Sequence, residues 1–136
     1  MKIAIVGSSH LSENEERDVR QFCAGIIKTF SSDVVIISGG AEGVDKIAIE
    51  VAENLEYETQ VYPPKEKKWD PPTKDGYKAR NMKIAQDCDI LYCFPTKLKT
   101  TPCYHCKVLD HEVTGGCWAM KYAKSLGKKT HLVPLI

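Results

Sequence analysis

The sequence lacks a long apolar run and an export signal. No segment approaches the ~18 consecutive apolar residues of a membrane-spanning helix. The apolar stretch at residues 3–6 is too short for the hydrophobic region of a signal peptide and is followed at once by Gly7. These absences predict a cytoplasmic protein without a membrane partner. In that reducing compartment, the six cysteines suit metal binding, catalysis or burial better than disulfides.

A charge excess of either sign is also missing. The chain carries 19 lysine and arginine residues against 18 aspartate and glutamate residues, for a formal net charge of +1. Because DNA-binding domains usually show a basic excess or a basic face, nucleic acid is not an expected partner. Some lysines could gather after folding, but a solvated surface is the favoured interpretation. These lysines are Lys65, Lys67, Lys68, Lys97, Lys99, Lys121, Lys124, Lys128 and Lys129.

What the chain does contain is a regular alternation of short apolar runs and amphipathic stretches. The apolar runs are typical of buried strands. The stretches between them place apolar residues at spacings of three and four, which predicts helices. Ser12 and Glu15 form a capping-box pattern before the first helix, and Gly127 suits a helix C-cap. Strands are predicted at 2–6, 34–37, 57–62, 90–94 and 130–134, with helices at 13–30, 44–55, 76–87 and 116–126.

This alternation predicts an α/β fold with a mostly parallel sheet and helices on both faces. The length suits a five-stranded, doubly wound, Rossmann-like sheet with the strand order 3-2-1-4-5. No linker or internal repeat interrupts the chain. We therefore expect one domain over residues 1–136, with a cysteine- and histidine-rich loop at about 95–117. An exposed helix face leaves homo-oligomerisation open.

Small and glycine-rich residues follow three of the predicted strands and run directly into helices. Ligands of open α/β sheets bind at the carboxyl ends of the strands. Glycines there allow close approach, and helix N-termini offer free N–H groups to phosphate. The usual fingerprints, G-x-G-x-x-G and G-x-x-x-x-G-K-[ST], are absent. The phosphate site predicted from the turns comprises Gly7, Ser8, Ser9, Ser38, Gly39, Gly40, Gly43, Thr114, Gly115 and Gly116.

Three segments and one tryptophan carry a family resemblance. Residues 37–45 read ISGGAEGVD, residues 76–81 read GYKARN and residues 89–94 read DILYCF, with Trp69 between the first two. This pattern resembles the SLOG superfamily, the Rossmann-like group that includes the DprA/Smf and LOG proteins, and in particular its small YspA-like branch. Gly115 and Gly116 stand where that superfamily has its second glycine motif.

The resemblance implies a site for a nucleotide or a nucleotide-derived ligand. It implies that Gly39, Gly40 and Gly43 cradle phosphate. It further implies that Arg80 hydrogen-bonds phosphate through its planar guanidinium and that Asn81 shapes the pocket. For Arg80, the alternative is a surface ion pair.

Two roles stay open for Asp45. By the resemblance it orders the glycine turn or meets a ribose hydroxyl of the ligand. By its position in the first turn of a helix, its carboxylate could instead satisfy backbone N–H groups of the protein.

One departure from the family pattern bears on catalysis. LOG-type phosphoribohydrolases carry a glutamate shortly after their second glycine motif, whereas residues 114–122 here read TGGCWAMKY and contain no carboxylate. Cleavage of a glycosidic bond normally needs a positioned carboxylate. A binding or sensing module is therefore favoured over a weak nucleotide hydrolase, and no catalytic residue is assigned.

A second constellation, with the spacing C-x2-C-x4-H-x5-C, suits tetrahedral zinc. Its four ligands are Cys103, Cys106, His111 and Cys117, and His105 is an alternative to His111. Four protein ligands leave no open position, so the zinc would be structural. The alternatives are a thiol redox pair at Cys103 and Cys106, or unligated cysteines that pack as small apolar residues.

The leading functional prediction is thus a protein that binds a small nucleotide-derived molecule, with a structural zinc ion beside the site. The first alternative is a single-stranded nucleic-acid-binding protein of DprA-like type. The second alternative is a thiol redox protein.

Overall fold

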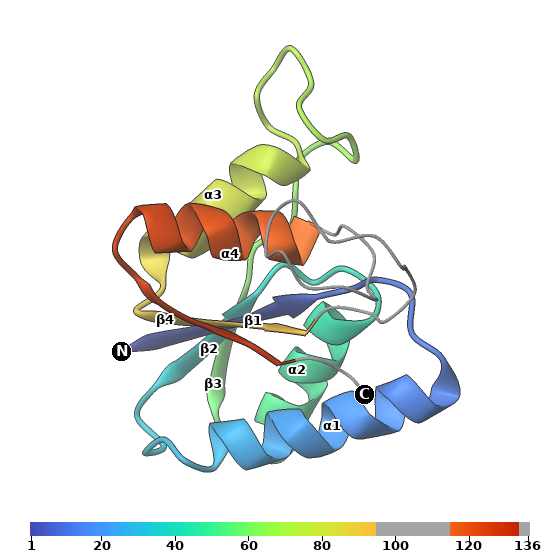
Figure 1. Cartoon of the computed structure of the whole chain (residues 1–136), viewed down its shortest axis with the longest axis vertical. Coiled ribbons are helices and arrows are strands. Elements are labelled where there is room, and N and C mark those ends of the chain that lie inside the picture. The colour runs from blue at the N-terminus through green and yellow to red at the C-terminus, as the bar shows by residue number, and fades with distance from the viewer. Residues whose placement is uncertain (95–114, 134–136) are drawn as a thin grey trace.

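The computed structural model describes residues 1–94 and 115–133, and only the backbone of residues 115–117. Strands and helices alternate along these residues (Figure 1). The strands are β1 (Lys2–Gly7), β2 (Val35–Ser38), β3 (Glu58–Val61), β4 (Ile90–Phe94) and β5 (Lys129–Leu132). The helices are α1 (Glu13–Ile27), α2 (Val44–Asn54), α3 (Tyr77–Asp87) and α4 (Gly115–Ser125). No helix in these ranges is long and apolar enough to cross a membrane.

The strands of the described residues form one parallel sheet in the order β3-β2-β1-β4-β5. β1 lies at the centre, where Ile3 is in register with Ile36 of β2 and with Ile90 of β4. The predicted α/β class, parallel sheet and strand order are confirmed. The carboxyl ends of all strands consequently meet at one end of the sheet, called the carboxyl end below.

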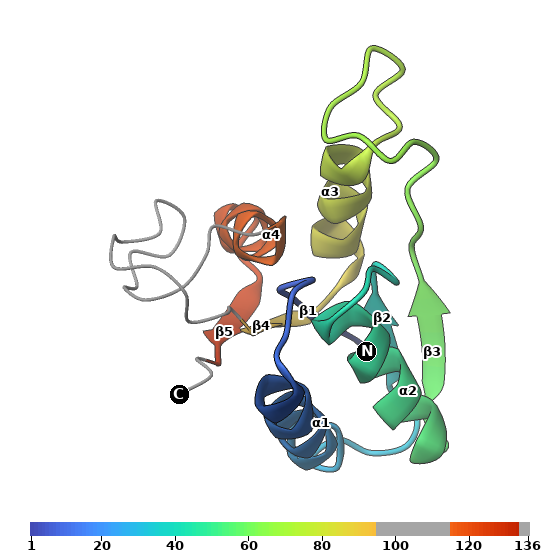
Figure 2. The ribbon, with the colours of Figure 1, turned by 90° about the vertical axis from the view of Figure 1, so that its right-hand side faces the viewer.

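Helices cover both faces of the sheet, with α1 and α2 on one face and α3 and α4 on the other (Figure 2). The side chains of β1 alternate between the two layers. Ile3 and Ile5 pack with the buried residues of α1 and α2, whereas Ala4 and Val6 pack with those of α3 and α4. Burial on both faces explains why the central strands are apolar throughout.

Local sequence signals predicted the starts of the elements better than their ends. The capping box is present, since Glu15 N–H donates to Ser12 Oγ at 3.2 Å and Ser12 N–H donates to Glu15 Oε1 at 2.9 Å. The first helix was expected to reach residue 30 but ends at Ile27, because Thr29 and Phe30 form tighter turns with bonds to carbonyls three residues back. β3 is an edge strand with largely exposed residues, which accounts for its polar middle.

Candidate functional site

The carboxyl ends of β1, β2 and β4 meet in backbone contacts that require glycine. Val44 N–H donates to the Ser8 carbonyl at 3.0 Å, and a Cβ on Gly43 would lie 2.3 Å from the same oxygen. Gly43 also has a φ of 84°, in the left-handed region that favours glycine. A Cβ on Gly7 would lie 2.3 Å from the Phe94 carbonyl oxygen. The predicted turns therefore converge, and these two glycines allow the backbones to pack closely.

The carboxylate of Asp45, in the first turn of α2, lies among these turns. Asp45 is 5% exposed, and its Oδ2 accepts a hydrogen bond from Gly39 N–H at 3.2 Å. Burial raises the pKa of Asp45 from 3.8 to about 6, although the Arg80 guanidinium and the backbone N–H groups of Gly39, Gly7 and Ala41 all act to lower it. An anion of the protein itself thus occupies N–H groups that were expected to face phosphate. Asp45 therefore satisfies a backbone N–H group and orders the glycine turn, and its contact with a ribose hydroxyl stays a prediction.

Arg80 fixes α3 to the end of β2. Its Nη1 donates to the Gly39 carbonyl at 2.7 Å and, more weakly, to the Tyr62 carbonyl at 3.4 Å. Its Nε donates to Asn81 Oδ1 at 2.8 Å, and the guanidinium lies over the Tyr77 ring at 5.3 Å from the centroid. Burial lowers the pKa of Arg80 below its ordinary value, and the nearby Asp45 carboxylate opposes this effect.

Gly39 is glycine because Arg80 packs on it. A Cβ at this position would lie 2.3 Å from Arg80 Nη1 and 2.7 Å from Asp45 Oδ2. Gly39, Asp45 and Arg80, all predicted site residues, thus lie in contact. Their role in binding a ligand stays a prediction, as it does for the rest of the predicted phosphate site.

The remaining residues of the predicted phosphate site are used largely within the fold. Ser38 Oγ is buried and donates to the Ile5 carbonyl at 2.6 Å. Ser8 Oγ is hydrogen-bonded to the backbone of His10. Gly40 has a φ of 74° and packs on Val61. Four further predicted site residues complete the description: Ser9 is exposed, Asn81 is buried, and Gly115 and Gly116 form the start of α4.

The predicted zinc site cannot be compared with the described structure. Several predicted residues lie outside the described structure, and so does the side chain of Cys117. These residues are Cys103, His105, Cys106, His111 and, from the predicted phosphate site, Thr114. Within residues 1–94 and 115–133, no group of three or more histidine, cysteine, aspartate or glutamate side chains is placed to hold a metal ion. A structural zinc ion, and the alternative of a redox pair, both stay predictions.

The cysteines that the structure does describe are buried thiols. Cys23 of α1, Cys88 at the end of α3 and Cys93 of β4 are all fully buried and form no disulfide, as the sequence pattern predicted. Burial raises the pKa of Cys23 to about 12 and that of Cys88 to about 11. Both stay protonated at neutral pH, so neither supports thiolate chemistry.

The most prominent feature of the carboxyl end is the loop of residues 62–76, which joins β3 to α3 and projects beyond the sheet (Figures 1 and 2). Its backbone caps α3, since Tyr77 N–H and Lys78 N–H donate to the carbonyls of Lys68 and Trp69, each at 2.8 Å. A Cβ on Gly76 would lie 2.1 Å from the Lys68 carbonyl oxygen, which explains the glycine at this position.

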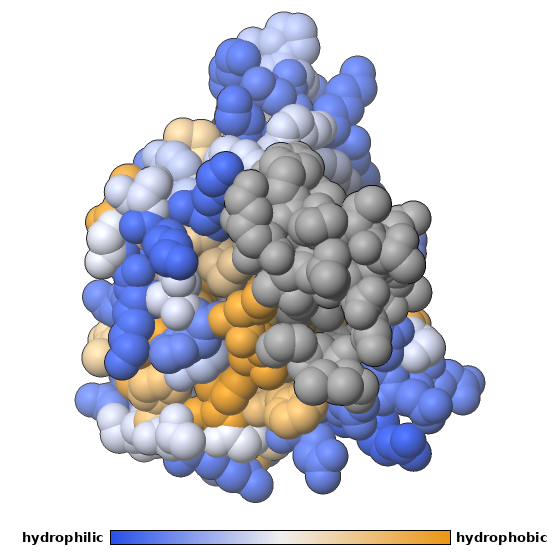
Figure 3. All heavy atoms as spheres, viewed as in Figure 1, coloured by the Kyte–Doolittle hydropathy of each residue, from blue (hydrophilic) through white to orange (hydrophobic). Residues whose placement is uncertain are grey.

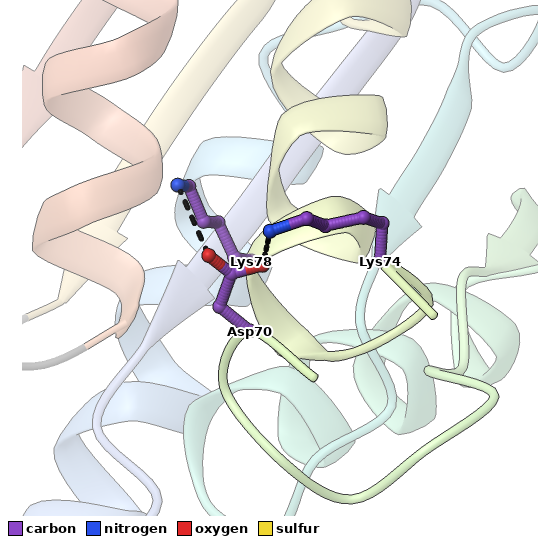
Figure 4. Close-up of polar contacts among 3 residues, drawn as sticks. All are labelled: Asp70, Lys74 and Lys78. Carbon is purple, nitrogen blue, oxygen red and sulfur yellow. Dashed lines mark hydrogen bonds and ion pairs between the residues drawn. The ribbon is translucent and has the colours of Figure 1, made fainter. Parts of the chain in front are cut away.

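A small charge cluster holds the middle of this loop against α3 (Figure 4). Asp70 lies between Lys74 Nζ at 3.3 Å and Lys78 Nζ at 3.5 Å. The pKa of Asp70 is lowered, chiefly by the hydrogen bond from Lys74. Ion pairs within the loop and from the loop to α3 therefore hold its middle in place.

Three other lysines of the loop point into solvent and were not among the predicted site residues. Lys65, Lys67 and Lys68 are exposed, and none forms an ion pair with any described residue. Figure 3 shows the projecting loop as a hydrophilic lobe of the surface. Their close spacing in the sequence was a usable signal, but the near-neutral net charge led us to expect a merely solvated surface.

Comparison with known proteins connects this fold to DNA processing. A family model described as DNA recombination-mediator protein A matches residues 1–91. The DNA processing protein A of Streptococcus pneumoniae is similar in structure, with a TM-score of 0.69 and 19% identity, over 99% of this chain and 50% of its own. The chain thus spans half the length of that relative. No curated protein matches the sequence.

Two further structures share the fold. The structural-genomics target TM1055 has a TM-score of 0.68 and 17% identity, over 95% of this chain and 71% of its own. The DNA processing protein A of Helicobacter pylori, whose structure is described for its single-stranded DNA binding mode, has a TM-score of 0.65 and 18% identity, over 100% of this chain and 66% of its own. These structures share the Rossmann-like fold, and the family model over residues 1–91 confirms the resemblance to the DprA/Smf proteins of the SLOG superfamily.

The expectation that nucleic acid is not a partner is wrong. It rested on the net charge of +1, and it is overturned by the family model and by the DNA-binding relative from Helicobacter. Net charge summed over the chain says little about a single loop, and three exposed lysines lie close together in the loop of residues 62–76.

Proposed function

Because the chain belongs to the DNA recombination-mediator protein A family, we propose that it binds single-stranded DNA at the carboxyl end of its sheet. A relative of the same fold is described for single-stranded DNA binding. Since the chain spans half of the pneumococcal relative, the proposal concerns DNA binding alone and no further activity of the longer proteins.

The observation that carries the proposal is the set of exposed lysines at positions 65, 67 and 68. They lie on a loop that is held by backbone hydrogen bonds. The N–H groups of Lys65 and Glu66 donate to the Asp75 carbonyl, and the first N–H groups of α3 donate to the carbonyls of Lys68 and Trp69. Because Asp70 is already paired with Lys74 and Lys78, it does not neutralise them. Lysines on a loop that is fixed in this way can contact successive phosphates of a DNA strand. Such contacts supply most of the affinity in sequence-independent binding.

Arg80 is a second source of positive charge at the same end of the sheet. Its Nη1 and Nε are used by Gly39, Tyr62 and Asn81. Its Nη2 forms no hydrogen bond to any residue that the structure describes and would be the nitrogen that meets a phosphate. A small nucleotide ligand, the first expectation from the sequence, has less support, because Asp45 already accepts from Gly39 N–H.

The test is a titration of a fluorescein-labelled oligo(dT) by fluorescence anisotropy over a range of salt concentrations. We expect binding that weakens steeply with salt. In the variant with Lys65, Lys67 and Lys68 all changed to Gln, the slope of log affinity against log salt should fall by about 2, at about 0.7 for each lost phosphate contact with a single strand.

The matched control removes the same charge from the opposite end of the sheet. Lys28 at the end of α1, Lys124 in the last turn of α4 and Lys129 at the start of β5 are exposed, and changing all three to Gln should leave the slope unaltered. Absence of oligo(dT) binding at low salt would refute the proposal. Equal slopes for the two triple variants would refute the assignment of the loop.

A further inference from the structure

The two tryptophans of the chain lie in contact although they come from different elements. Trp69 of the loop packs edge to face on Trp118 of α4, with ring centroids 5.2 Å apart and an interplanar angle of 85°. Trp118 in turn stacks on Tyr122, one helical turn further along, at 5.4 Å and 6°. These three residues are called the aromatic cluster below.

The fold does not need the aromatic cluster to hold the loop in place. The loop is already fixed to α3 by two backbone hydrogen bonds and by the pairing of Asp70 with Lys74 and Lys78. Trp69 remains 43% exposed, whereas a ring that served only as an anchor would be buried. The cluster thus leaves open aromatic surface on the carboxyl end of the molecule.

Exposed lysines lie beside the cluster, and the adjacent Asp70 is already paired with Lys74 and Lys78. Lys67 and Lys68 precede Trp69 directly, and exposed Lys121 lies on α4 between Trp118 and Tyr122 in the sequence. A partner that fits this surface must offer flat apolar groups for the rings together with negative charge for the lysines. Unpaired bases joined by phosphates combine both, since every base presents a π-face and each linkage carries a charge.

We infer that the aromatic cluster binds unpaired DNA bases by stacking, with Trp69 as the principal contact. This inference rests on the proposed function and names the part of the strand that the site recognises. Stacking tolerates any base and needs the base face to be accessible. Paired bases in a duplex are covered on both faces, so the site should prefer single strands over duplex DNA.

The experiment compares oligo(dT) with an abasic oligomer that carries the same number of phosphates. Because both tryptophans belong to the cluster, the intrinsic tryptophan emission reports on it directly. We expect oligo(dT) to quench this emission and the abasic oligomer to leave it unchanged. By anisotropy of end-labelled oligomers, oligo(dT) should bind about tenfold more tightly than the abasic oligomer.

Variants identify the residue responsible. Trp69→Ala should reduce the affinity for oligo(dT) to that for the abasic oligomer, and Trp69→Phe should restore most of it. The control is Phe22→Ala, which removes a comparably exposed aromatic side chain, 47% exposed, from α1 on the opposite face of the sheet. It should bind oligo(dT) as the unaltered protein does.

The outcomes separate the inference from the proposed function. If both oligomers bind equally well without quenching, base stacking is refuted while DNA binding stands. If neither oligomer binds at low salt, both are refuted. If Trp69→Ala retains the full preference for oligo(dT), the cluster is not the stacking site.

Discussion

At the scale of single residues, the carboxyl end of the sheet is organised by an internal anion. Asp45 accepts from Gly39 N–H, and Arg80 donates to the carbonyl of the same residue. Gly39 therefore lies between the buried Asp45 carboxylate and the Arg80 guanidinium. These two contacts join α2 and α3 to the end of β2. The contact geometry gives the glycine, the aspartate and the arginine of this pattern roles within the fold, and the contact of Arg80 Nη2 with an external phosphate stays a prediction.

The raised pKa of Asp45 predicts a specific pH dependence of stability. The pKa rises from 3.8 to about 6 on folding, so the folded state binds the proton more tightly than the unfolded state does. The resulting stabilisation is fully present below about pH 4 and is lost as the pH rises through about 6. The quantity to compare is the free energy of unfolding of the wild type minus that of Asp45→Asn. This difference should be larger at pH 4 than at pH 7, by up to about 3 kcal/mol.

Urea denaturation at several pH values measures this difference, and Asp70→Asn provides a control of opposite sign. The pKa of Asp70 is lowered from 3.8 on folding, so the contribution of Asp70 is present above about pH 4 and the corresponding difference for Asp70→Asn should decrease as the pH falls further. A difference for Asp45→Asn that does not change with pH would show that its carboxyl group titrates alike in the folded and unfolded states.

At the scale of elements, α3 and the loop before it form one unit. The loop carbonyls of Lys68 and Trp69 accept from the first N–H groups of α3, which have no partner within the helix. Gly76 permits this approach, because a Cβ there would lie 2.1 Å from the Lys68 carbonyl oxygen and 2.5 Å from Pro71 Cδ. The position of Trp69 therefore depends on a glycine in the adjoining turn.

Gly76→Ala should detach the loop from α3. We expect amide hydrogen exchange at Tyr77 and Lys78 to become at least about tenfold faster, with a loss of about 2 kcal/mol in the free energy of unfolding, because the new methyl group displaces both carbonyls. The control is Gly25→Ala in α1, where no atom lies within 4 Å of the added Cβ. It should raise the stability by about 0.5–1 kcal/mol. Unchanged exchange at Tyr77 and Lys78 in Gly76→Ala would contradict this account of the loop.

The elements were largely predictable from the sequence, whereas the contacts between them were not. Periodicity, the capping box at Ser12 and the strand-ending glycines are local signals, and they predicted the helices, the strands and the sheet order. The bond from Arg80 to Gly39 and the contact of Trp69 with Trp118 join distant segments. Their register depends on how α3 and α4 pack on the sheet, which no short window of sequence encodes.

At the scale of the whole molecule, a nearly neutral chain has an uneven surface. The formal net charge is +1, yet the loop after β3 combines an exposed tryptophan with three exposed lysines that form no ion pair with any residue the structure describes. Both α3 and α4 begin at this end, so the loop, the aromatic cluster and Arg80 belong to one region of the surface (Figure 1). The uneven distribution reconciles the overall charge with the proposed binding of a polyanion.

The most direct test of this account is a ¹H–¹⁵N NMR titration of the protein with oligo(dT) at low salt. We predict that the perturbed backbone amides fall on the loop of residues 62–76 and on the first turns of α3 and α4, and that the indole N–H signals of Trp69 and Trp118 shift with them. Perturbations confined to the opposite end of the sheet, around Lys28 and Lys129, or no perturbation at all, would contradict it.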